Sequence, residues 1–176
     1  MGIETGWLKD YIRDIPDFPR PGVIFKDLTP LLADAAAFAR AVDVLVEHLG
    51  RCPVDKVIGI EARGFIVAAP VAYRLGAGFV PVRKAGKLPG PAERQEYALE
   101  YGTDVLEMHS DALRAGERVA VIDDVLATGG TAAATVALVQ AVGAEVVALG
   151  FVLELGFLGG RSRLVGHDPT ALITYE

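Results

Sequence analysis

The sequence contains one cysteine, Cys52, so no disulfide bond can form within the chain. It has no apolar run near the roughly 20 residues that span a bilayer. Its first residues do not combine a basic region with an apolar run, as a secretory signal does. Together these absences predict a cytoplasmic protein that does not cross a membrane.

Basic residues are outnumbered, because 17 Lys and Arg face 23 Asp and Glu and leave a net charge of −6. This balance argues against a protein whose partner is a nucleic acid or a membrane surface. It does not exclude an anionic small substrate, because backbone dipoles and a bound cation act locally. The three histidines are scattered without the spacing of metal ligands.

The 176 residues, 52% of them hydrophobic, fit one domain over 1–176 with a large core. Segments typical of strands and helices alternate from Val54 to Val152, which predicts an α/β fold with a mainly parallel sheet and helices on both faces. Ligands bind beyond the carboxyl ends of the strands in such sheets. The segments expected at those ends are Glu61–Gly64, Arg83–Lys87, Asp123–Thr131 and Glu154–Gly156.

The most informative stretch is VAVIDDVLATGGTAAA, residues 119–134. An expected buried strand, Val119–Ile122, is followed by Asp123 and Asp124, a loop of small residues and a helix N-terminus. Unpaired backbone N–H groups at such a terminus suit a phosphate. No Lys follows the glycines, so the loop is not a Walker A motif, and it lacks the spaced glycines of the Rossmann fingerprint. An ordinary strand, turn and helix with two solvated acids is the alternative.

Two other segments depart from regular patterns. Ile15–Phe25 contains three prolines and one glycine, which predicts an ordered but irregular arm whose apolar side chains are covered; the alternative is a surface linker. Lys84–Glu96 is polar, which predicts a mobile loop that closes over a site, with a plain surface loop as the alternative. Two strands joined at Gly102, Tyr97–Tyr101 and Thr103–Met108, are expected to follow it.

The strand, the two acids and the loop Ala127–Thr131 resemble the phosphoribosyl-pyrophosphate (PRPP) motif of type I phosphoribosyltransferases. Four other segments resemble the adenine phosphoribosyltransferase family, in that family's order: Pro21–Asp27, Glu61–Phe65, Arg83–Gly90 and Leu99–Gly102. The resemblance runs from about residue 8 to the end. It implies the type I phosphoribosyltransferase fold with an N-terminal hood or arm over 1–33 and a flexible loop and β-hairpin flap over 84–109. It also suggests a homodimer.

The reaction that the resemblance implies is the transfer of the phosphoribosyl group from PRPP to adenine, giving AMP and pyrophosphate, with Mg²⁺. Asp123 and Asp124 would hold the ribose hydroxyls, directly or through Mg²⁺ and water. No direct protein ligand to the metal is expected, with these two acids as the only candidates. The 5′-phosphate would be wrapped by Ala127, Thr128, Gly129, Gly130 and Thr131. The pyrophosphate side would contain Arg63, Arg83 and Lys87, which stabilise the charge of the leaving group.

Glu100 would be the acid/base residue, and Tyr101 would shape the closed flap. Adenine would lie against the arm, read by backbone groups of Ile24 and Lys26, with Phe25 stacking on the base and Leu155 opposite. Lys26 stands where the family often has Arg, and the segment 91–96 has more charge than is usual in the family. The resemblance also suggests a cis peptide between Glu61 and Ala62. A phosphoribosyltransferase for another purine and a non-catalytic PRPP-binding regulator are the alternative functions.

Overall fold

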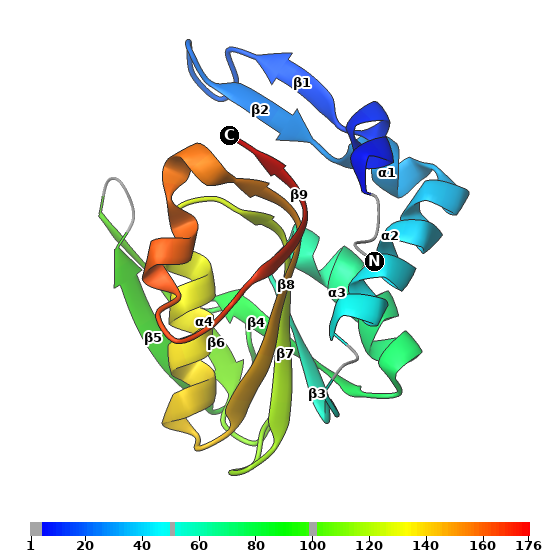
Figure 1. Ribbon diagram of the computed structural model, residues 1–176. Helices are drawn as coiled ribbons and strands as arrows, with labels where there is room; N and C mark the ends of the chain where they lie inside the picture. Colours follow the sequence, from blue (N-terminus) through cyan, green and yellow to red (C-terminus); the bar gives the residue numbers. More distant parts are fainter. Residues whose placement is uncertain (1–4, 50–51, 99–101) are drawn as a thin grey trace.

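The computed structural model describes residues 5–49, 52–98 and 102–176. Its centre is a seven-stranded sheet in the order β5-β6-β4-β3-β7-β8-β9 (Figure 1). The five parallel strands are β3 (Lys56–Ile60), β4 (Gly78–Lys84), β7 (Arg118–Leu126), β8 (Glu145–Leu155) and β9 (Thr170–Tyr175). Antiparallel pairing adds β5 (Ala92–Ala98) and β6 (Thr103–His109). The expected mainly parallel sheet is therefore confirmed.

Helices cover both faces of this sheet, as the sequence predicts. On one face lie α2 (Ala35–Leu49) and α3 (Arg63–Leu75), and on the other lies α4 (Gly130–Ala141) (Figure 1). The side chains of β7 alternate between the two cores: Val119 and Val121 pack in the cluster that contains α4, and Ala120 and Ile122 in the cluster of α2 and α3. All four are fully buried, which explains why this strand is an unbroken apolar run.

The N-terminal part forms a hood over the end of the sheet. It consists of a short 3₁₀ helix η1 (Gly6–Tyr11), strands β1 (Arg13–Pro16) and β2 (Ile24–Asp27), and helix α1 (Thr29–Ala33). The arm is more regular than expected, because β1 and β2 form a two-stranded antiparallel sheet. This pairing is possible because Pro16 lies at the end of β1 and the other two prolines lie in the turn. The Phe18–Pro19 peptide there is cis.

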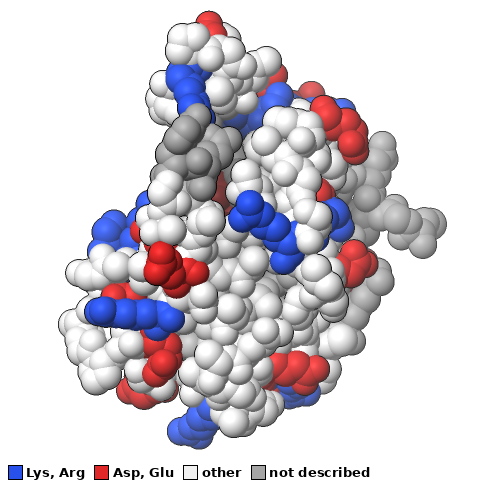
Figure 2. Space-filling model, turned by 90° about the vertical axis from the view of Figure 1, so that its left-hand side faces the viewer, with Lys and Arg blue, Asp and Glu red and all other residues white. Residues whose placement is uncertain are grey.

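The expectation of one loop over Lys84–Glu96 is wrong. Ala92 already begins β5, which pairs with β6 from Ala92 opposite His109, so only residues 85–91 connect β4 to the hairpin. A polar strand is stable here because β5 is at the edge of the sheet, where alternate side chains face solvent. Figure 2 shows this side of the molecule, where charges of both signs are interspersed among uncharged residues.

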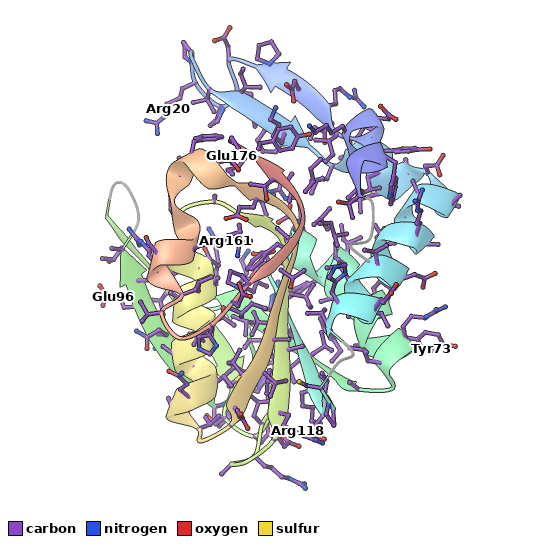
Figure 3. The ribbon with its side chains drawn as sticks, in the orientation of Figure 1. Arg20, Tyr73, Glu96, Arg118, Arg161 and Glu176 are labelled. Atoms are coloured by element: carbon purple, nitrogen blue, oxygen red, sulfur yellow. The ribbon has the colours of Figure 1, made fainter. Side chains whose placement is uncertain are left out.

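After β8 the chain makes two short 3₁₀ turns, η2 (Gly156–Leu158) and η3 (Gly160–Arg163). Arg161 anchors this segment to the sheet (Figure 3), because its Nε lies 2.8 Å from Oε1 of the buried Glu154 and its Nη2 2.8 Å from Oε2. Within the described residues, no helix is both long enough and apolar enough to cross a membrane.

Candidate active site

The site lies where the pairing of β7 with β3 ends and only the pairing with β8 continues. β3 pairs with β7 only as far as Ile122, whereas β8 continues alongside β7 to Leu126. The strand therefore extends beyond the expected end at Ile122, and Asp123 and Asp124 lie inside it. Because no strand covers the other edge of β7 at this point, both carboxylates border the space beneath the hood.

A cavity of about 500 Å³ lies between the hood and the carboxyl ends of β3, β7 and β8. It brings together most of the residues predicted for the site. Of those residues, the lining includes Ile24, Phe25, Lys26, Arg63, Asp123, Asp124, Ala127, Thr131 and Leu155. It also includes Glu61, for which no role was predicted. A smaller adjoining hollow of about 60 Å³ is lined by Thr128, Gly129 and Gly130, and shares Asp123, Ala127 and Thr131 with the first.

The loop 127–131 presents a helix N-terminus to this hollow. Gly129 has a φ of 78°, a left-handed conformation that favours glycine, and α4 begins at the next residue. The N–H groups of the first helical turn have no partner within the helix and can receive an anion. The loop is packed closely from behind, because a Cβ added at Gly160 would collide with the carbonyl oxygen of Ala127.

The two acids of β7 differ in their partners. Asp124 is buried, and its Oδ2 lies 2.7 Å from Arg63 Nε in an ion pair that lacks hydrogen-bond geometry. The backbone N–H of Asp124 donates to Asp123 Oδ1 over 2.9 Å. Burial and the adjacent charge of Asp124 raise the pKa of Asp123 well above its usual range. Burial also raises the pKa of Asp124, although Arg63 opposes that shift.

These acids fit a hydrated cation better than a metal held by protein alone. Across the described part of the chain, no three His, Cys, Asp or Glu side chains come together to hold a metal ion. Among the described residues the two carboxylates have one cationic partner, Arg63, and both have raised pKa values. A divalent ion beside them would offset that excess of negative charge while keeping water or ligand oxygens in its shell.

The expected pyrophosphate-side residues do not all gather in one place. Arg83 and Lys87 meet at the carboxylate of Glu61, at distances of 3.3 Å from Arg83 Nε and 2.6 Å from Lys87 Nζ. Arg63 instead joins Asp124 to the hood, because its guanidinium lies 5.4 Å from the centre of the Phe25 ring. The peptide between Glu61 and Ala62 is cis, as the resemblance suggested.

On the hood side, Phe25 also packs edge-on against Phe18, with ring centres 5.2 Å apart. The side chain of Lys26 is already engaged: its Nζ lies 2.7 Å from Asp14 Oδ1 and 4.1 Å from the centre of the Tyr175 ring. Lys26 thus fastens the hood to β9. Because β2 pairs with β1 alone in the part of the chain that the structure describes, the other edge of β2 has backbone groups without a strand partner there.

Glu100 and Tyr101 lie outside the described residues. The adjacent part of the hairpin contacts the loop 127–131 through Tyr97, whose hydroxyl is 3.3 Å from Asp104 Oδ2 and also hydrogen bonds with Thr131. Partial burial raises the pKa of Tyr97, although the Thr131 contact lowers it. The described end of β5 therefore lies beside the predicted phosphate loop.

Three residues of this site had no role in the sequence analysis: Glu61, Tyr97 and Gly160. Glu61 directly follows a core strand. That position could have indicated a role, because ligand sites in α/β sheets lie at the carboxyl ends of the strands. Tyr97 was expected only as the first residue of a strand in the hairpin. Nothing in the sequence near Gly160 indicates that it meets a loop some 30 residues earlier, because only the folded chain brings the two backbones together.

Known proteins with similar sequences belong to the family that these residues and their arrangement suggest. The family model described as "Phosphoribosyl transferase domain" matches residues 30–158. An adenine phosphoribosyltransferase of Acidothermus cellulolyticus is 64% identical over 163 residues, which cover 93% of this chain and 92% of the relative. The chain belongs to the adenine phosphoribosyltransferase family.

Solved structures of adenine phosphoribosyltransferases have the same fold. That from Thermoanaerobacter pseudethanolicus has a TM-score of 0.94 and 50% identity, covering 98% of this chain and 100% of its own. That from Saccharomyces cerevisiae, complexed with adenine and an imino-altritol bisphosphate, has a TM-score of 0.90 and 39% identity, covering 96% and 97%.

Gly160→Ala tests whether the close packing behind the loop 127–131 matters for the activity of the family. The added methyl group would push the Ala127 carbonyl and displace the loop, so kcat/KM for PRPP should fall roughly 10- to 100-fold. Steady-state kinetics would measure this loss. Gly6→Ala is the matched control, because a Cβ at Gly6 meets no atom within 4 Å. Wild-type kinetics in Gly160→Ala would show that the loop tolerates the displacement.

Proposed function

We propose that this protein transfers the 5-phosphoribosyl group of PRPP to adenine, giving AMP and pyrophosphate in purine salvage. The observation that carries the proposal is the arrangement of one cavity. The hood strand β2 and Leu155 line one part, the paired acids of β7 line the next, and the loop 127–131 with the α4 N-terminus closes the far end. A nucleotide presents its base, ribose and phosphate in the same order, and these three groups suit an apolar stacking surface, carboxylate acceptors and backbone N–H donors respectively.

The 5′-phosphate would bind in the loop 127–131, held by backbone N–H groups and by the hydroxyls of Thr128 and Thr131. Asp123 and Asp124 would accept hydrogen bonds from the ribose hydroxyls. As the bond from C1′ to the pyrophosphate breaks, the ribose becomes positively charged, and carboxylates near the ring stabilise that charge. Arg63, held by Asp124, would contact the leaving pyrophosphate, and Arg83 and Lys87 would neutralise its far side.

Mg²⁺ is the cofactor that this chemistry requires, because it neutralises pyrophosphate oxygens and makes pyrophosphate a better leaving group. The residues that would hold it are Asp123 and Asp124, through water and the ribose hydroxyls. Their raised pKa values and single cationic partner support this assignment.

Adenine would lie between Phe25 and Leu155, both of which line the cavity. The backbone groups of Ile24 and Lys26 on the unpaired edge of β2 would read its polar edge. A backbone carbonyl that accepts from the 6-amino group would face an oxygen in hypoxanthine or guanine. Such an unpaired oxygen pair is costly, so the site discriminates against 6-oxopurines.

A purine panel tests this function. Purified protein with PRPP and Mg²⁺ should convert adenine to AMP, with kcat/KM for hypoxanthine, guanine and xanthine lower by about 100-fold or more. Removal of Mg²⁺ with a chelator should abolish turnover. Preference for a 6-oxopurine would establish a different purine as the substrate. No AMP from folded protein would contradict the enzyme assignment and favour a PRPP-binding regulator.

The charges on the described surface make a DNA-binding regulator the weaker alternative. A DNA-binding regulator needs a basic surface, and the described residues on the face in Figure 2 mix Lys and Arg with Asp and Glu. The net charge of −6 also argues against a DNA-binding surface.

Glu100→Ala tests the acid/base assignment that rests on the resemblance. Loss of a group that transfers a proton during attack by N9 of adenine should lower kcat by about 100-fold or more. The Kd for adenine should change little, because Glu100 would act in the transition state rather than in ground-state binding. Kinetics combined with calorimetric titration of adenine would separate the two quantities. A wild-type kcat would remove Glu100 from the mechanism.

We also propose a cytoplasmic homodimer. The single cysteine suits a reducing compartment. For the dimer, the support is an exposed apolar surface on α3 and β4, where Ile66, Tyr73 and Phe79 are 45%, 85% and 39% exposed. Light scattering should give the mass of two chains for the wild type and of one chain for Tyr73→Glu. A wild-type protein with the mass of one chain would contradict the proposal.

A further inference from the structure

The carboxylate of Glu61 holds the two cations expected to meet pyrophosphate. Its Oε1 accepts from Lys87 Nζ over 2.6 Å, and its Oε2 accepts from Arg83 Nε over 3.3 Å and from the backbone N–H of Lys84 over 3.0 Å. Arg83 closes the cluster by donating from Nη1 to the carbonyl oxygen of Lys87 over 3.0 Å. Glu61 thus joins the end of β3 to the end of β4 and the segment that follows it.

This carboxylate is also a fixed negative charge. The Glu61 side chain is 9% exposed. Burial acts to raise its pKa, but the hydrogen bonds from Lys87, Lys84 and Arg83 lower it to about 2. The group therefore stays ionised throughout the pH range in which enzymes of this kind work. Because it lines the same cavity as Arg63, it faces the region where pyrophosphate would bind.

A permanent anion in this position competes with pyrophosphate in two ways. It repels the incoming polyanion directly, and it neutralises part of the charge of Lys87 and Arg83. For Lys87, full contact with pyrophosphate weakens the contact with Glu61, since both anions use the same ammonium group. The carboxylate keeps the cations in place when the site is empty, and it lowers their affinity for the product.

We propose that Glu61 is an internal counter-anion that weakens the binding of pyrophosphate and so speeds its release. This role rests on the proposed function, because it presupposes that pyrophosphate is the product held by Lys87 and Arg83. It assigns to Glu61 a task distinct from bond making, since the carboxylate acts on the product through the cations that it holds.

The test is calorimetric titration of the wild type and of Glu61→Gln with inorganic pyrophosphate in the presence of MgCl₂. The isosteric amide keeps one accepting oxygen but has no charge, so pyrophosphate should bind roughly three- to tenfold more tightly to Glu61→Gln than to the wild type. In the AMP-forming reaction, inhibition by added pyrophosphate should strengthen by the same factor. Equal or weaker binding to Glu61→Gln would overturn the proposal and leave Glu61 a structural link.

Three comparison variants separate charge from fit. Glu61→Asp keeps the charge, so its pyrophosphate affinity should stay near that of the wild type. A gain equal to that of Glu61→Gln would show that shape, not charge, is responsible.

In a Lys87→Met background the gain from Glu61→Gln should shrink, because one shared cation is absent. An undiminished gain would overturn the role of Lys87. Glu145→Gln removes an exposed charge at the opposite end of β8 and should have no effect.

Two further outcomes have defined meanings. If Glu61→Gln does not fold, as judged by circular dichroism and thermal melting, Glu61→Ala provides a second neutral variant with the same expected gain. If Glu145→Gln tightens pyrophosphate binding as much as Glu61→Gln, net charge explains the result and the proposal fails. A wild type that binds no pyrophosphate would overturn the proposed function itself, whereas binding without a gain in Glu61→Gln overturns the counter-anion alone.

Discussion

The end of the ladder between β3 and β7 at Ile122 is the constraint on which the rest of the site depends. Up to that point β7 is paired on both sides and buried on both faces. Beyond it, β8 alone continues alongside, so β7 still has a rigid strand geometry but one open edge. Asp123 and Asp124 are held by this half-paired stretch, which fixes their positions more firmly than a loop could. The chain after β3 turns away at Glu61 and Arg63, and the space between the two strands becomes the cavity.

Arg63 connects the parts of this cavity that a nucleotide would bridge. Its Nε lies beside Asp124 and its guanidinium lies over the Phe25 ring, so one side chain joins the proposed ribose region to the proposed base region. The hood is tied separately to β9 by Lys26, which lies over Tyr175. Arg63 and Lys26 therefore both help to hold the hood against the rest of the fold. The position of the proposed base pocket relative to the two acids then follows from such contacts rather than from the turn between β1 and β2.

Local signals predicted the half of the site that is local in sequence. A buried strand, two acids, glycines and a helix follow one another directly between 119 and 142. Because this pattern is contiguous in the sequence, the loop 127–131 was correctly placed at a helix N-terminus. The edge strand β5 was misread as a loop because the sequence has the polarity of a surface segment, and only pairing with β6 makes it a strand. The contacts of Glu61 and Gly160 depend on segments about 20 to 30 residues away, and no pattern within either segment specifies them.

The distribution of charge explains why an acidic protein can bind a polyanion. On the proposed pyrophosphate side, Arg83 and Lys87 are paired with Glu61, so little of their positive charge is left without a partner. On the proposed ribose side, Asp123 and Asp124 outnumber Arg63, the one cation paired with them among the described residues. A substrate with several phosphate charges and a divalent ion brings both signs with it, and each sign has a complementary place. Such a site would gain most of its attraction when substrate and metal arrive together, because each sign of charge then meets its complement.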